Sequence, residues 1–226
     1  MKKYFDKIYC INLDSRSDRW NQCIEEFKKV GIEDIVERFS AEQLIPGIAG
    51  CTKSHYEIIK QCKKNNFKNV LILEDDVTFI NSNFLETIDK SISQLKSNGL
   101  SYDMLYLGGN LLQDSNRNFK IDSNLAKLTY CKTTHAFAIN ESIYDIFLNS
   151  FENINWSDNN NWYHGNPTRF NIDMWYVKNI QQLGNVYGVY PCLAEQRESY
   201  SDLLNANSYI PMAQTWDNLL EGSTND

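Results

Sequence analysis

Three consecutive carboxylates follow the most hydrophobic segment of the chain. Residues 70–79 read VLILEDDVTF, so Glu74, Asp75 and Asp76 come directly after four apolar residues. Adjacent carboxylates repel one another, and a divalent cation would relieve that repulsion. A solvated acidic turn would explain the same pattern. The cation site is favoured if the surrounding segments form an α/β sheet, because such sheets bind ligands at the carboxyl ends of their strands.

A second polar segment follows the first hydrophobic run of the chain. Residues 12–20 read NLDSRSDRW, and Arg16 and Arg19 could contact a diphosphate or a nucleoside there. The Asp and Ser residues of this segment are also good helix N-caps. The segment therefore indicates either a ligand-binding loop or the start of a helix.

A third segment, residues 50–62, reads GCTKSHYEIIKQC and predicts an amphipathic helix over 52–64. Ser54 and His55 would then lie in the first turn, where free backbone N–H groups and the helix dipole favour an anion. The alternative is structural, with the hydroxyl capping the helix and the imidazole packing against its neighbours.

Composition and charge limit the class of protein. The chain has 226 residues, of which 42% are hydrophobic, and this is enough for the core of one domain. Its formal net charge of −7 disfavours a nucleic-acid partner, which normally meets a basic surface. No run approaches the roughly 20 apolar residues of a membrane span. The first apolar run is interrupted by charges, so a signal peptide is not expected.

The cysteines and the phosphate-binding motifs narrow the class further. The six cysteines are scattered without a CxxC pair, which favours reduced thiols in a cytoplasmic protein, with peripheral attachment to a membrane left open. Neither GxGxxG nor GxxxxGK[ST] occurs, and this argues against a Rossmann dehydrogenase and a P-loop NTPase.

Strand and helix patterns alternate along the chain. Strands are predicted over 7–13, 35–41, 70–73, 103–109, 136–140 and 186–191. Helices are predicted over 18–30, 52–64, 84–95, 141–151 and 173–183, and loops over 43–50, 110–126 and 153–171. Alternation of this kind predicts an α/β fold with a mainly parallel central sheet, as one domain over residues 1–226.

In the order of its motifs the chain resembles glycosyltransferase family 25, the group of lipooligosaccharide galactosyltransferases and related collagen galactosyltransferases. The matching pieces are INLDSRSDRW, RFSA, GCTKSH, LILEDDV, DMLYLGG, THAFAIN, IDMW and VYPCLAEQRESYSD, from about residue 7 to residue 202. The succession of GCxxSH and LEDDV is the most specific part. The resemblance implies a GT-A type nucleotide-sugar-binding fold and an inverting, metal-dependent transfer of a hexose, galactose or glucose, from a UDP-sugar donor.

The resemblance also implies roles for the acidic motif. Residues 74–76 look like the DxD metal motif of such enzymes, with Asp75 and Asp76 as metal ligands and Glu74 facing the ribose or the ion. Mn²⁺, or Mg²⁺, is the expected cofactor, because these ions accept carboxylate and diphosphate oxygens in an octahedral shell. A further ligand would come from water or from one of Glu195, Gln196, Glu198, Asp202, His135 and His164.

A direct displacement needs a base for the acceptor hydroxyl. Asp173 matches the Asp of the IDMW piece and is the expected catalytic base, with Asp158 and Glu195 as alternatives and helix capping as the bland explanation. The acceptor would be a glycan or a hydroxylated protein.

The remaining expected contacts divide between donor and acceptor. The donor contacts are Asn12, Arg16, Arg19, Ser54, His55, Glu74, Gly108 and Gln196. The acceptor contacts are Trp156, Trp162, Tyr163 and His135, since aromatic faces suit sugars, although the aromatic residues could equally form a small satellite core. Two rival functions are a nucleotidyltransferase, which also uses paired carboxylates, and a non-catalytic nucleotide-sugar or glycan-binding module of the same fold.

Overall fold

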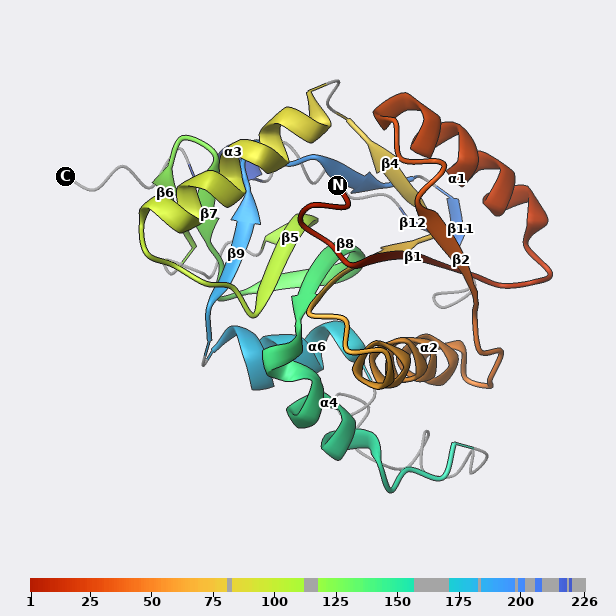
Figure 1. Cartoon of the computed structure of the whole chain (residues 1–226). Helices are drawn as coiled ribbons and strands as arrows, with labels where there is room; N and C mark the ends of the chain where they lie inside the picture. Colours follow the sequence, from red (N-terminus) through yellow and green to blue (C-terminus); the bar gives the residue numbers. More distant parts are fainter. Residues whose placement is uncertain are drawn as a thin grey trace.

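A sheet runs through the centre of the molecule (Figure 1). The computed structural model describes residues 1–80, 83–111, 118–156, 171–182, 184–197, 199–201, 206–208, 216–218 and 220. Its strands are β1 (Lys7–Asn12), β2 (Val36–Ser40), β3 (Asn69–Glu74), β5 (Met104–Leu111), β6 (Phe119–Asp122), β7 (Leu125–Lys127), β8 (Cys131–Asn140) and β9 (Val186–Val189). Within these residues the strand order is β2-β1-β3-β8-β5-β9-β7-β6.

Most of the strands share one direction. β1 is parallel to both β2 and β3, and β5 is parallel to β9. β8 is antiparallel to β3 and β5, and β7 is antiparallel to β9 and β6. Only β7 and β8 are therefore reversed among the described strands of this sheet. The predicted α/β class with a mainly parallel sheet is confirmed.

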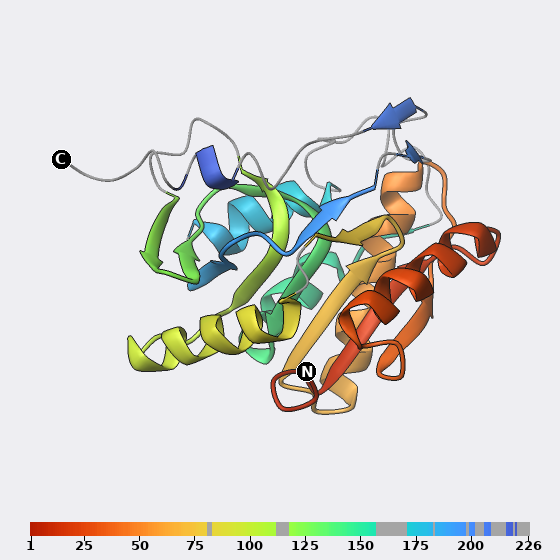
Figure 2. The ribbon, with the colours of Figure 1, turned by 90° about the horizontal axis from the view of Figure 1, so that it is seen from above.

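Helices cover both faces of the sheet. α1 (Ser17–Val30) and α3 (Phe84–Ser97) cover one face, and in Figure 2, which looks onto that face, both lie in front of the sheet. α2 (Gly47–Lys64), α4 (Tyr144–Phe151) and α6 (Ile172–Tyr176) cover the other. A 3₁₀ turn, η1 (Glu141–Ile143), precedes α4, and a π-helical turn, η3 (Val177–Gln181), continues α6. Among the described residues no helix is both long enough and apolar enough to cross a bilayer.

The central strands are apolar on both faces because helices pack on each side. Residues 70–73 of β3 are completely buried, and alternate members belong to different hydrophobic clusters. Val70 and Ile72 pack with α2, α4 and α6, whereas Leu71 and Leu73 pack with α1 and α3. This two-sided burial accounts for the unbroken apolar run before the acidic motif.

α1 ends where the sequence predicts. Gly31 adopts a left-handed conformation with φ of 68°, and its N–H donates to the carbonyl of Lys28 at 3.2 Å. The N–H of Ile32 donates to the carbonyl of Phe27 at 3.0 Å, so the pair closes the last turn. Glycine tolerates this conformation without a steric penalty. The predicted stop at Gly31 is confirmed.

α2 begins earlier than predicted. It starts at Gly47, directly after Pro46, and the predicted loop over 43–50 therefore contains its first turn. Proline tolerates a helix start because the first backbone N–H groups of a helix have no intrahelical partner. Ser54 and His55 consequently lie two turns inside the helix. The expectation that they face an anion at the helix N-terminus is wrong.

The sequence patterns did not predict the short antiparallel ribbons. β4 (Val77–Phe79) pairs with β10 (Ala194–Gln196), and β11 (Ser199–Ser201) pairs with β12 (Ala206–Ser208). The predicted loop over 110–126 holds the end of β5, all of β6 and the start of β7. Strands this short carry too few residues for period-two alternation to stand out. The β4–β10 ribbon matters most, because it brings the C-terminal part of the chain to the acidic motif.

Candidate functional site

A pocket of about 380 Å³ lies at the carboxyl ends of β1, β2 and β3. Its walls come from the loop after β1, the loop over 41–47 that follows β2, one face of α2, and the acidic motif after β3. This is the edge at which open α/β sheets bind ligands. The acidic motif therefore lies in a pocket and is not a solvated turn.

Asp75 is held by two protein donors. Asn12 Nδ2 donates to Asp75 Oδ2 at 2.7 Å, and Arg19 Nη1 donates to Asp75 Oδ1 at 2.7 Å. The side chains of Arg19 and Asp75 are each 11% exposed, so this ion pair is nearly dry. Both carboxylate oxygens are thus engaged. The contacts support Asp75 as the anchor of the motif on β1 and α1, and they leave its predicted metal ligation without structural support.

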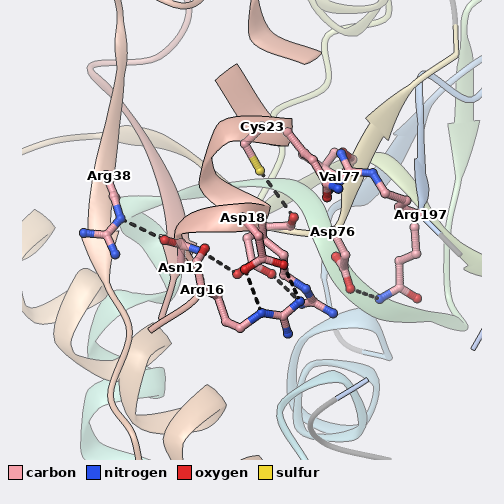
Figure 3. Close-up of polar contacts among 12 residues, drawn as sticks. Asn12, Arg16, Asp18, Cys23, Arg38, Asp76, Val77 and Arg197 are labelled. Carbon is pink, nitrogen blue, oxygen red and sulfur yellow. Dashed lines mark hydrogen bonds and ion pairs between the residues drawn. The ribbon is translucent and has the colours of Figure 1, made fainter. Parts of the chain in front are cut away.

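Asn12 connects the acidic motif to two neighbouring segments. Besides Asp75, its Nδ2 donates to the carbonyl of Arg16 at 3.0 Å. Its Oδ1 accepts from Arg38 Nε at 2.8 Å, and Figure 3 shows these two side chains joined across β1 and β2. Arg38 was not among the expected site residues, although it opens the RFSA piece. Asn12 is 1% exposed and positions the acidic motif, and it also lines the pocket, so its donor contact stays a prediction.

Arg16 is the cation that faces the pocket from the loop before α1. Its Nε and Nη2 donate to the two oxygens of Asp18 at 3.0 and 2.9 Å, a two-pronged contact that Figure 3 shows. Asp18 is exposed, whereas Arg16 is on the pocket wall. The pair orients the guanidinium in the region where the sequence predicts a diphosphate or nucleoside contact.

Asp76 has one carboxylate oxygen that lacks a hydrogen-bond partner among the described residues. Its Oδ2 accepts from Gln196 Nε2 at 3.2 Å, and its carbonyl accepts from the N–H of Arg197 at 2.6 Å, so the end of β10 and the residue after it hold Asp76. Figure 3 shows Asp76 beside Arg197. Its Oδ1 is buried and has no hydrogen-bond partner among the described residues. Burial, then the charges of Glu74 and Asp75, raise the pKa of Asp76 to about 7. A carboxylate that is repelled by two neighbouring charges and has one buried oxygen without a partner is suited to bind a cation.

Glu74 is held by side chains of β8 and α2. Its Oε1 accepts from Thr134 Oγ1 at 2.6 Å and lies 3.3 Å from His55 Nε2. Burial opposes the charge on Glu74, but the hydrogen bond and charge of His55 and the bond from Thr134 outweigh it and lower its pKa. Glu74 therefore stays ionised beside Asp76.

The two helix residues predicted to contact the donor have different surroundings. His55 is completely buried and faces Glu74. Ser54 Oγ donates to the carbonyl of Gly50 at 2.8 Å and accepts from the N–H of Glu42 at 2.9 Å. Ser54 thereby fastens the pocket loop to α2, and it also lines the pocket.

Asp173 lies next to the acidic motif through two consecutive residues of β8. Thr133 donates its N–H to Asp173 Oδ2 at 3.3 Å, while the next residue, Thr134, holds Glu74. Asp173 Oδ1 is buried and has no partner within the described part of the chain. Burial raises the pKa of Asp173 above its ordinary value. Thr133 has φ of 68°, which is strained for a β-branched residue, and the strain coincides with this contact.

Two predicted site residues, His135 and Gly108, pack against the backbone of β10. His135 is completely buried, with Nδ1 3.1 Å from Thr133 Oγ1 and Nε2 3.2 Å from the carbonyl of Ala194. A Cβ added to Gly108 would lie 2.0 Å from that same carbonyl oxygen. Gly108 is therefore required for the close approach of the β10 backbone. The expected acceptor contact of His135 and donor contact of Gly108 gain no support from these positions.

Trp156 packs against the outer side of α2. Its ring centroid lies 5.7 Å from that of Tyr56 and 6.3 Å from that of Phe151. This packing matches the satellite-core explanation, and an acceptor contact stays a prediction. Glu195 lies in β10 beside Gln196, and adjacent strand residues point to opposite faces. The remaining candidates fall outside the described residues, namely Asp158, Trp162, Tyr163, His164, Glu198 and Asp202.

Comparison with known proteins gives a consistent family. Residues 33–157, more than half of the chain, match the sequence profile of Glycosyltransferase family 25 (LPS biosynthesis protein). Human procollagen galactosyltransferase 2 is 26% identical over 138 residues, which cover 50% of this chain and 22% of that protein. A Drosophila melanogaster glycosyltransferase 25 family member is 29% identical over 141 residues, or 50% of this chain and 22% of that protein. Human inactive glycosyltransferase 25 family member 3 is 26% identical over 130 residues, or 46% and 22%.

Solved structures give weaker similarities. A197 from STIV has a TM-score of 0.45 and 12% identity over 90% of this chain and 93% of that one. A glycosyltransferase involved in the glycosylation of the major capsid of PBCV-1 has a TM-score of 0.38 and 13% identity, over 70% and 74%. Both TM-scores are below 0.5, so the assignment rests on the sequence match, which spans about a fifth of the length of the relatives above. By that match, this chain belongs to glycosyltransferase family 25.

Proposed function

We propose that this chain is a metal-dependent glycosyltransferase of GT-A architecture. It moves a hexose, galactose or glucose, from a UDP-sugar to a hydroxyl group of a glycan or a hydroxylated protein, with inversion at the anomeric carbon. The observation that carries the proposal is Asp76, a half-buried side chain on the wall of a pocket at the carboxyl ends of β1–β3. One of its carboxylate oxygens is buried and has no partner among the described residues. A relative named procollagen galactosyltransferase supports the choice of galactose.

The metal is assigned to Asp76, since Asp75 is already paired. Mn²⁺ or Mg²⁺ suits the oxygen of Asp76, and Gln196 fixes the other oxygen of the same carboxylate. When bound, the ion supplies positive charge for the diphosphate leaving group. The Arg19–Asp75 pair keeps the motif in place for this purpose.

The nucleotide part of the donor is assigned to the pocket itself. Ile11, Leu44 and Ile45 give it apolar walls, and Arg16 gives it a cation oriented by Asp18. Small-molecule pockets combine these features, with apolar area for a base and a few polar groups that fix orientation. A volume of about 380 Å³ is within the range of such pockets.

Asp173 is assigned as the base. Thr133 holds its Oδ2, which leaves Oδ1 to take the proton from the acceptor hydroxyl. As that proton leaves, the hydroxyl oxygen forms a bond to the anomeric carbon, the bond from this carbon to the phosphate oxygen breaks, and its electron pair leaves with UDP. Attack opposite the leaving group inverts the carbon. The raised pKa of Asp173 makes it a stronger base than an exposed aspartate.

The test compares UDP release from UDP-galactose and UDP-glucose with and without Mn²⁺, in the wild type and in Asp76→Asn. Asp34→Asn is the matched control, because Asp34 is an exposed carboxylate far along the chain from the motif. We expect Mn²⁺-dependent release in the wild type and control, and loss of both release and Mn²⁺-dependent UDP binding in Asp76→Asn. UDP release at the same rate with and without Mn²⁺ would refute the metal assignment. Tight UDP-sugar binding without any release or transfer would favour the non-catalytic module.

A further inference from the structure

Glu74 of the acidic motif and two side chains of α2 form a mixed group of metal ligands, to which the proposed transfer assigns no step. Cys51 and His55 are four residues apart in α2, so they share one face of the helix. The Cys51 sulfur, a His55 ring nitrogen and a Glu74 carboxylate oxygen all lie within 4.8 Å of one another. Thiolate, imidazole and carboxylate together are the ligand set of zinc sites.

The spacing within this group is close to that of a tetrahedral site. Two ligands that each lie about 2.0 Å from Zn²⁺ at the tetrahedral angle are about 3.3 Å apart. His55 Nε2 and Glu74 Oε1 are separated by 3.3 Å. Atoms in the group that lie as far apart as 4.8 Å would have to move roughly 1 Å closer before the sulfur and its neighbours could bind one zinc ion. Cys51 borders the pocket, which gives room for that shift.

Charge and access also favour a cation. Burial, followed by the charges of Glu74, Asp173 and Asp76, raises the pKa of the Cys51 thiol. The same negative charges attract a cation, and a bound cation would stabilise the thiolate in return. His55 is completely buried, and its Nε2 already faces the Glu74 carboxylate. Cys51 and Glu74 both line the pocket, which gives an ion a path in and an open position on the pocket side.

We propose that Cys51, His55 and Glu74 form a binding site for Zn²⁺ or a similarly borderline-soft divalent cation, separate from the oxygen site at Asp76. Mn²⁺ and Mg²⁺ prefer oxygen ligands, so the sulfur and nitrogen ligands select against them. The site requires only residues of this chain and does not depend on the proposed transfer. Because Glu74 adjoins Asp76, Zn²⁺ bound here is expected to inhibit any Mn²⁺-dependent activity.

Cobalt is the probe, because Co²⁺ reports thiolate ligation through an intense near-ultraviolet charge-transfer band. Metal-free protein titrated with Co²⁺ is expected to develop this band at one equivalent. Zn²⁺ should displace the Co²⁺, and Mn²⁺ in tenfold excess should not. Cys51→Ser should abolish the band. It should also weaken Zn²⁺ binding by more than the roughly 10–100-fold that loss of an outer-shell partner costs.

Two control variants make the result decisive. Cys62→Ala removes another buried thiol of the same helix and should keep the band. Asp76→Asn should keep the band while losing Mn²⁺-dependent UDP binding, so failure of the transfer proposal and failure of the zinc proposal give different results. Circular dichroism and thermal unfolding establish that Cys51→Ser is folded, and His55→Gln serves as a second ligand variant. The proposal is overturned if the wild type shows no band or if the band persists in Cys51→Ser.

Discussion

His135 should make the protein less stable in weak acid. Its ring is completely buried between β8 and β10, where it faces Thr133 and the carbonyl of Ala194. Burial lowers the pKa of His135 from 6.5 to about 4, although the carbonyl and the charge of Glu74 favour the proton. The folded protein therefore holds the neutral ring at pH values where the unfolded chain has already taken up a proton.

The sign and size of the effect follow from this difference. A depressed histidine pKa means that stability is fully present above about pH 6.5 and is lost as the pH falls toward 4. The full loss is about 3 kcal/mol, because the pKa falls from 6.5 to about 4 on folding. Between pH 7 and pH 5 the same two pKa values give about 2 kcal/mol. Solvent does not screen the ring, because it has no exposed surface.

The assay is urea unfolding at pH 7 and pH 5, in the presence of a chelator so that metal binding does not contribute. Wild type is compared with His135→Gln and His135→Asn, whose amides can still donate to Ala194 and accept from Thr133. Both variants should be less stable at pH 7, but they should lose about 2 kcal/mol less than wild type between the two pH values. Equal losses in all three proteins would show that His135 is not the buried neutral group described above.

Three further substitutions test the site. Arg19→Met should cost about 3–5 kcal/mol of unfolding free energy, because it leaves Asp75 buried without its ion-pair partner. Adding Asp75→Asn to that variant should recover part of the loss in the same urea assay, and no recovery would contradict the pairing. Gly108→Ala should lower the unfolding free energy by about 1–3 kcal/mol or more, since its Cβ would meet the carbonyl of Ala194 at 2.0 Å; an unchanged melting temperature would refute this. Asp173→Asn should slow transfer by about 10² or more with donor affinity within a few-fold, and a lost donor affinity would instead place Asp173 on the donor side.

The parts of the fold that local sequence determines were predictable. α1 has apolar residues at helical spacing and a glycine that closes its last turn, and both signals lie within the segment itself. The unbroken apolar run of β3 indicates a strand buried on both faces, and the structure packs helices on each side of it. The position of the acidic motif at a strand end then follows from the chain order alone.

The contacts that each carboxylate of the acidic motif makes were not predictable from local sequence, because they come from distant parts of the chain. Gln196 reaches Asp76 through a three-residue ribbon that has no visible alternation. Asp173 accepts from the N–H of Thr133, whose φ of 68° is a conformation that nothing in its residue type favours. Arg38 was missed for a similar reason, since its role depends on the register that places it opposite Cys10, from where its side chain reaches Asn12.

Three adjacent carboxylates therefore have three different surroundings, and this difference determines what each can do. Asp75 is neutralised by Arg19 and satisfied by Asn12, so it has least to gain from an ion. Glu74 is satisfied at one oxygen by Thr134 and His55, which keeps it charged. Asp76 receives the repulsion of both neighbours and has one oxygen without a partner, so the unfavourable energy of the motif is concentrated on this residue. A divalent cation gains most where that energy is highest, and the contacts of the two neighbours are what direct it to Asp76.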